Sequence, residues 1–87
     1  MSTVLRVDAR ISGIRVTDES ITAELVDGRT VSVPLAWSWR LMDATPEQRA
    51  NLRLIGSGQG VHWPELDEDI SVRGMLDGVP AERPRRS

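Results

Sequence analysis

His62 is the only histidine in the 87-residue chain, so it is the first side chain to consider for chemistry. Histidine can serve as a general base or a metal ligand near neutral pH. It stands between Val61 and Trp63 in an expected strand, where successive side chains point to opposite faces. If those two neighbours are buried, His62 faces away from the core. No serine has the G-x-S-x-G spacing of a nucleophile elbow, and the sequence therefore predicts no catalytic residue.

An acidic stretch follows at residues 65–69, and its carboxylates could bind a hard cation. These acidic residues are Glu65, Asp67, Glu68 and Asp69. Calcium loops place oxygen ligands at alternate positions around a central glycine, which this stretch lacks. We therefore predict a solvated loop, with Asp69 as the N-cap of a helix, and no metal. The alternative is a small-ligand or metal-dependent enzyme that uses His62 and the acidic loop 65–69. An acidic docking face for a basic partner is a third interpretation, and Asp67 and Glu68 would belong to it.

Gly56, Gly58 and Gly60 invite comparison with the glycine-rich loops that bind phosphate. Such loops lead into a helix whose N-terminus holds the anion. Here the glycines lead into residues 61–64, which end in proline and cannot start a helix. The chain also has no lysine for a Walker motif. We interpret the segment as a turn and predict no cofactor.

The chain has no phenylalanine or tyrosine, and its three tryptophans are Trp37, Trp39 and Trp63. Tryptophan serves as an anchor both in cores and in interfaces. Trp37 and Trp39 are two residues apart on an expected helix, so they cannot both face the same core. One of them is expected on an exposed or partner-covered surface. The candidate interface residues are Trp37, Trp39, Trp63, Asp67 and Glu68.

The elements that position these residues follow from the apolar pattern. Apolar and polar residues alternate on either side of Asp27-Gly28, which favours a hairpin with a type I′ turn. With a preceding strand, this gives an antiparallel β-meander over about residues 11–33. Its predicted buried face consists of Ile14, Val16, Ile21, Ala23, Leu25, Val31 and Val33.

After Pro34 the apolar period becomes helical. Leu35, Trp39 and Met42 share one face of a helix expected at about residues 35–43. A second, surface helix is expected at about 46–52, because Thr45 can cap it, proline suits its first position and Gln48 completes a capping box.

A β-hairpin is predicted at about residues 54–63, and a C-terminal helix at about 70–77 that stops at Gly78. The fold class is therefore α+β, with the meander packed on short helices. We expect a single domain at 1–80 and a disordered tail at 81–87.

Charge and composition limit the partners. All 11 basic residues are arginines, and residues 1–82 carry 8 of them against 13 acidic residues, a net charge of −5. Such a body matches a phosphate backbone poorly, so nucleic acid is not the expected partner. The alternative is a nucleic-acid-associated accessory that acts through the arginines of the tail.

The compartment follows from what the sequence lacks. No apolar run is long enough to span a membrane, and the N-terminus has no signal-peptide core. Without cysteine, redox chemistry does not fix the compartment. We expect a cytoplasmic protein.

Four segments together resemble a known family. They are residues 27–37, 44–51, 55–56 and, as the closest match, His62-Trp63-Pro64-Glu65-Leu66-Asp67-Glu68-Asp69-Ile70-Ser71-Val72. Their ordered succession over about 11–78 looks like the family catalogued as domain of unknown function 2442. The resemblance implies a small bacterial α+β domain. Some members carry a helix-turn-helix domain after it, for which we expect no room beyond residue 80.

Other members are encoded beside a small partner, an arrangement that suggests toxin–antitoxin pairs. The resemblance implies no catalytic residue. We therefore expect a non-enzymatic protein-interaction module, an antitoxin-like or regulatory partner of another small bacterial protein. The partner would be another protein or a second copy of the chain, bound through an edge strand or an outward-facing tryptophan.

Overall fold

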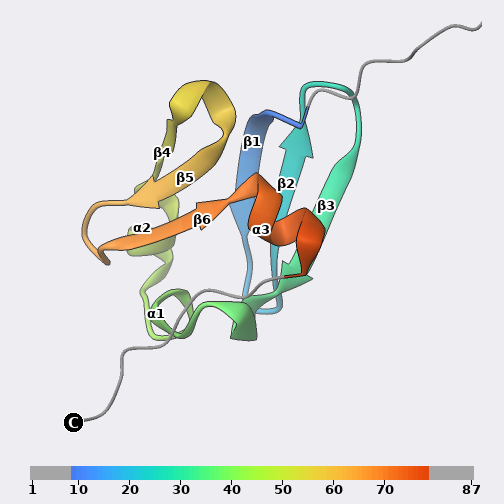
Figure 1. Ribbon diagram of the computed structural model, residues 1–87. Coiled ribbons are helices and arrows are strands. Elements are labelled where there is room, and N and C mark those ends of the chain that lie inside the picture. The colour runs from blue at the N-terminus through green and yellow to red at the C-terminus, as the bar shows by residue number, and fades with distance from the viewer. Residues whose placement is uncertain (1–8, 79–87) are drawn as a thin grey trace, which may run out of the picture.

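Two three-stranded antiparallel sheets and three short α-helices form the part of the chain that the computed structural model describes, residues 9–78 (Figure 1). The strands of the first sheet are β1 (Ile11–Val16), β2 (Ser20–Leu25) and β3 (Thr30–Pro34). Those of the second sheet are β4 (Arg53–Ile55), β5 (Gly60–Trp63) and β6 (Glu68–Ser71). The helices are α1 (Trp39–Met42), α2 (Pro46–Ala50) and α3 (Val72–Asp77). The α+β prediction is confirmed; the tail predicted at 81–87 lies outside the described residues.

The predicted meander is the first sheet, with β2 in the centre. Of the predicted inward-facing residues, Ile21, Ala23, Leu25 and Val33 are buried, and Ile14, Val16 and Val31 are partly buried against them. Ile11 is buried as well. The register shifts between Ile11 and Gly13, and this irregularity lets Ile11 and Ile14 share one face although they are three residues apart.

The hairpin turn between β2 and β3 differs from the predicted type. Gly28 has a positive φ of 94°, as expected, but Asp27 does not. A type I′ turn needs positive φ at both central residues, so that prediction is wrong. The Gly28 N–H donates to the Leu25 carbonyl at 3.0 Å, and the Asp27 carboxylate accepts from the Arg29 N–H at 3.1 Å. This side-chain hydrogen bond stabilises a three-residue loop instead.

The helix expected at 35–43 is broken in two at Ser38. A 3₁₀ turn covers Leu35–Trp37, Ser38 is extended, and α1 follows. The Ser38 hydroxyl accepts from the Leu41 N–H at 3.2 Å, so serine caps a new helix instead of continuing the old one. The break also changes the helical phase: Leu35 is buried, whereas Met42 is exposed.

Helix α2 begins as predicted, at a complete capping box formed by Thr45 and Gln48, and none of its residues is buried. The predicted hairpin at 54–63 is also present, as β4 and β5.

Asp69 as an N-cap is wrong, because residues 68–71 pair with β5 as strand β6. Ser71 caps α3 instead, by accepting from the Gly74 N–H at 2.9 Å, and Gly78 ends the helix in the left-handed conformation, as predicted.

The core lies where the two sheets and helices α1 and α3 meet. Apart from the first sheet and Leu35, its buried side chains are Leu41 of α1, Val61 and Trp63 of β5, and Val72 and Met75 of α3. Within residues 9–78, no helix is long and apolar enough to cross a membrane.

Candidate functional site

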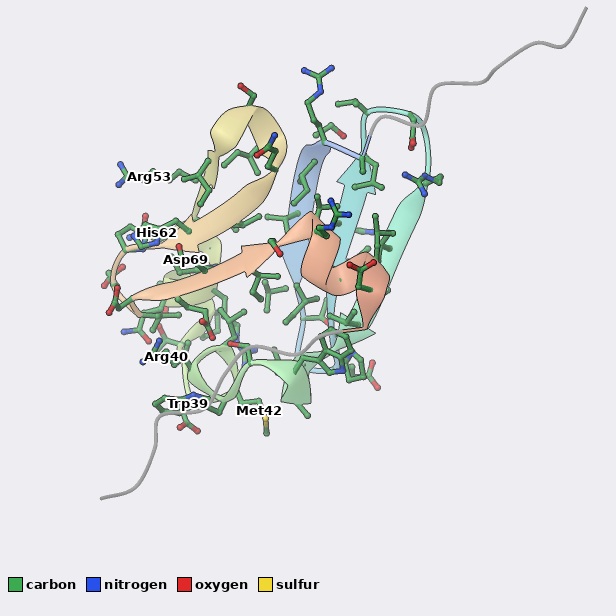
Figure 2. The ribbon with its side chains drawn as sticks, viewed as in Figure 1. Trp39, Arg40, Met42, Arg53, His62 and Asp69 are labelled. Atoms are coloured by element: carbon green, nitrogen blue, oxygen red, sulfur yellow. The ribbon has the colours of Figure 1, made fainter. Side chains whose placement is uncertain are left out.

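Helix α1 presents a mixed apolar and cationic surface, formed by Trp39, Arg40 and Met42 (Figure 2). We call these three residues the α1 surface. The Arg40 guanidinium lies 5.1 Å from the centroid of the Trp39 ring, within the range of a cation–π contact. Met42 is 48% exposed. The Trp39 indole Nε1 is covered but has no hydrogen-bond partner.

Polar contacts fix α1 to Asp67 and to Glu68, the first residue of β6. The Ser38 hydroxyl donates to the Glu68 carboxylate at 2.5 Å, and Arg40 donates to the Asp67 carbonyl at 2.7 Å. Leu41 anchors the same helix in the core. The α1 surface is therefore held by contacts between residues far apart in the sequence. Ser38 and Glu68 are 30 residues apart, and Arg40 and Asp67 are 27 residues apart.

Glu68 has a buried carboxylate that accepts hydrogen bonds from two different residues. It accepts from the Ser38 hydroxyl and, at 3.2 Å, from the Asp69 N–H, and Arg40 lies 4.0 Å away. A buried charge is tolerated when it is paired and hydrogen-bonded in this way. Glu68 thus positions α1.

Two of the five candidate interface residues lie in the interior. Trp63 is fully buried and donates its Nε1–H to the Arg49 carbonyl at 2.9 Å, and Glu68 is 4% exposed. Neither offers a surface to a partner, because the inward faces of β5 and β6 carry them. Trp37 is half-buried against the core and Trp39 is half-buried on α1. Asp67 is exposed, in a turn where its φ is 51°.

Arg53, His62 and Asp69 form a row across the outer face of the second sheet, because the register places Arg53 opposite His62 and His62 opposite Asp69 (Figure 2). His62 Nδ1 lies 2.6 Å from Asp69 Oδ1. His62 faces away from buried Val61 and Trp63, as predicted. A carboxylate at Nδ1 orients an imidazole as in a catalytic triad. Within the described chain, however, no hydroxyl is hydrogen-bonded to His62.

The acidic residues of the predicted loop 65–69 are dispersed. Glu65 accepts from the Asn51 amide at 2.7 Å, Glu68 is buried, and Asp69 pairs with His62. Among residues 9–78, no group of three or more potential ligands could hold a metal ion.

The glycine-rich segment is a structural turn that leads into β5. Gly58 has a φ of 97°, and a Cβ added there would lie 2.8 Å from the Ile11 carbonyl oxygen. Only glycine permits this approach between the turn and the first sheet. The segment therefore positions β1 and has no helix N-terminus to hold a phosphate.

The family model described as "Protein of unknown function (DUF2442)" matches residues 11–81. The chain belongs to this family. No match was found among the curated proteins.

Two solved structures share the fold of this DUF2442 chain. A protein of unknown function from Rhodospirillum rubrum is 26% identical, with a TM-score of 0.72, over 85% of this chain and 92% of that one. An uncharacterized protein from Chromobacterium violaceum is 25% identical, with a TM-score of 0.70, over 84% of this chain and 69% of that one.

Sequence reasoning missed two exposed residues of the DUF2442 chain, Met42 and Arg53. The sequence places Met42 on one helical face with Leu35 and Trp39, but the break at Ser38 leaves Leu35 buried and Met42 exposed. No sequence pattern distinguishes Arg53 from the other arginines, since its isolation depends on which carboxylates the fold brings near it.

Proposed function

We propose that this DUF2442 chain is a non-enzymatic protein-interaction module that binds its partner through the α1 surface. The observation that carries the proposal is the exposed Met42 next to half-buried Trp39 on a helix fixed by polar contacts. Methionine adapts its shape to a partner, and tryptophan supplies large contact area. A partner that covers both would bury apolar area without reordering the helix.

The resemblance to family members encoded beside a small partner supports an antitoxin-like or regulatory role in the cytoplasm. The partner would be another small bacterial protein or a second copy of the chain. The formal net charge of −2 favours a protein over a nucleic acid as partner. The arginine-tail alternative concerns residues outside the described part.

Met42→Glu tests this proposal, with Val26→Glu as a matched control. Met42 is 48% exposed and Val26 is 47% exposed, so neither substitution removes a core residue. A charge on the α1 surface should abolish association, measured by sedimentation at micromolar concentration and by capture from the native host. The control should associate like the wild type. Equal association of both variants and the wild type would contradict the proposal.

The second candidate function is a small-ligand or metal-dependent enzyme, which the 2.6 Å contact between His62 and Asp69 favours. A metal that binds only the folded state must raise the melting temperature. For the interaction module we expect no shift with calcium, magnesium or zinc. A saturable shift that Asp69→Asn removes would favour the enzyme instead.

A further inference from the structure

Strand β4 is a free sheet edge in the described part of the chain. The order of the second sheet is β4-β5-β6, so β4 pairs with β5 on one side and with no strand on the other (Figure 1). All three residues of β4 are exposed, and Leu54 and Ile55 are 40% and 41% exposed. The unpaired N–H and C=O groups of an edge strand are a template for another strand.

The side chains of β4 alternate between the two faces of the sheet. Leu54 pairs with buried Val61 and lies on the inner face, at the margin of the core. Arg53 and Ile55 lie on the outer face, where Arg53 stands opposite His62. The side chains of an added strand would cover Leu54 on the inner face of the sheet and Ile55 on the outer face.

Arg53 is the one arginine within residues 9–78 whose side chain has no hydrogen bond or ion pair. The other six are Arg10, Arg15, Arg29, Arg40, Arg49 and Arg73, and each has such an interaction. Asp69 lies in the same row, but it is on β6, two strands away from Arg53. It pairs with His62 on the strand between them. The free edge therefore carries an uncompensated positive charge that a carboxylate would complement.

A small hollow lies on the outer face of the second sheet, between Ile55 of β4 and residues 69–71 of β6. Its volume is about 220 Å³, and Ile55, Gly60, Ile70 and Ser71 are among the residues that line it. Pockets for small molecules and cofactors usually measure about 300–1,000 Å³. The hollow is thus better matched to one aliphatic side chain of a partner than to a cofactor.

We propose that the free edge of β4 binds an extended segment of a partner protein by antiparallel strand addition. In this arrangement a carboxylate of the segment lies opposite Arg53, and aliphatic side chains lie opposite Leu54 and Ile55. Main-chain hydrogen bonds supply affinity in this mode of recognition, and the alternating side chains supply specificity. The inference rests on the proposed function because it assumes a protein partner, but it concerns a different surface.

A second copy of the chain fits this edge less well. Two β4 strands paired antiparallel about Leu54 would place each Arg53 opposite the Ile55 of the other copy. No carboxylate would then face the free guanidinium. The charge therefore favours an acidic segment of another protein.

Nuclear magnetic resonance titration of the ¹⁵N-labelled protein with capped hexapeptides tests the proposal. The probe Ser-Ile-Val-Glu-Thr-Ser should shift the β4 amide signals saturably, and replacing its glutamate with lysine should weaken binding by about tenfold or more. Arg53→Glu should reverse this preference between the two peptides. Arg73→Glu, an equal charge change on exposed α3, should leave the preference unchanged.

Two further peptides separate strand addition from side-chain attraction. One carries N-methyl groups on its isoleucine and glutamate, and the other on its valine and threonine. Because alternate amides of a strand point to opposite edges, only one of the two should lose binding. Absence of binding to the probe, equal binding of the glutamate and lysine peptides, or equal binding of both methylated peptides would overturn the inference.

Met42→Glu keeps the two proposals separate. It should leave peptide binding at β4 intact while it abolishes association through the α1 surface. Loss of peptide binding at β4 in Met42→Glu would contradict the assignment of that binding to the β4 edge. Association through the α1 surface without peptide binding would overturn only the inference about β4.

Discussion

The two sheets have the same strand order but are held together differently. In the first sheet, strands of five or six residues pair along their length and bury one aliphatic face. In the second, strands of three or four residues depend on polar contacts to the helices. Trp63 donates to the Arg49 carbonyl, and Glu68 accepts from Ser38. Local pattern thus specifies the first sheet and the β4–β5 hairpin, whereas contacts distant in sequence fix α1 against β6.

Both proposed contact surfaces lie in the region of the second sheet. Strand β4 is an edge of that sheet, and Ser38, the N-cap of α1, is hydrogen-bonded to Glu68 of β6. All three residues of β4 are exposed, and α1 exposes Met42 beside half-buried Trp39 and Arg40. The polar contacts hold these exposed groups in place, so the less regular half can present a defined surface. The following substitutions test whether the second region depends on single side chains more than the first does.

Trp63→Ala should have the largest effect on stability. It removes a fully buried indole and its hydrogen bond to the Arg49 carbonyl, at an expected cost of about 3–5 kcal/mol in the free energy of unfolding. Urea denaturation monitored by circular dichroism measures this loss. Trp37→Ala should cost less, because Trp37 is only half-buried. Equal costs would mean that Trp63 is no special anchor of the second sheet.

Arg49→Ala should cost about 2–3 kcal/mol, because hydrogen bonds of a charged group are strong and the Arg49 side chain is only 11% exposed. Arg49 donates to the carbonyls of Leu41 at 2.9 Å and Met42 at 3.3 Å, and it also pairs with Asp18. The Asp18 side chain is 94% exposed, so Asp18→Asn should cost less than about 1 kcal/mol. Thermal melts of the two variants measure the difference. If Asp18→Asn cost as much as Arg49→Ala, the ion pair would be the dominant contact.

Gly58→Ala and Gly28→Ala compare the two regions at matched backbone angles. Gly58 has a φ of 97° and Gly28 one of 94°, so both variants should lose about 1 kcal/mol from backbone strain. A Cβ at Gly58 would also lie 2.8 Å from the Ile11 carbonyl oxygen, whereas a Cβ at Gly28 meets nothing within 4 Å. Gly58→Ala should therefore melt at the lower temperature. Similar melting temperatures would show that the turn adjusts freely against β1.

Sequence predicts the elements whose causes are local. The alternation around Ile21, Ala23 and Leu25 predicts β2, and the capping box of Thr45 and Gln48 predicts the start of α2. Gly78 ends α3 for an equally local reason.

The errors arise where a distant partner decides the structure. Ser38 ends a 3₁₀ turn and caps α1, and its hydroxyl also donates to Glu68. Asp69 lies in a strand because residues 68–71 pair with β5. At the candidate site, the tryptophans suggested a contact surface. The solitary charge of Arg53 has no counterpart in the sequence, since it depends on the positions of all the carboxylates near it.

The three tryptophans have a spectroscopic consequence. Because the chain has no tyrosine or phenylalanine, its near-ultraviolet absorption and intrinsic fluorescence come from indole alone. Trp63 lies wholly inside, Trp37 is half-buried against the core, and Trp39 lies under a guanidinium on α1. Each indole therefore has its own polarity and neighbours. In a Trp37→Leu variant the two remaining emitters are Trp39 and Trp63. A partner on the α1 surface should then change the emission of Trp39, while buried Trp63 supplies an internal reference.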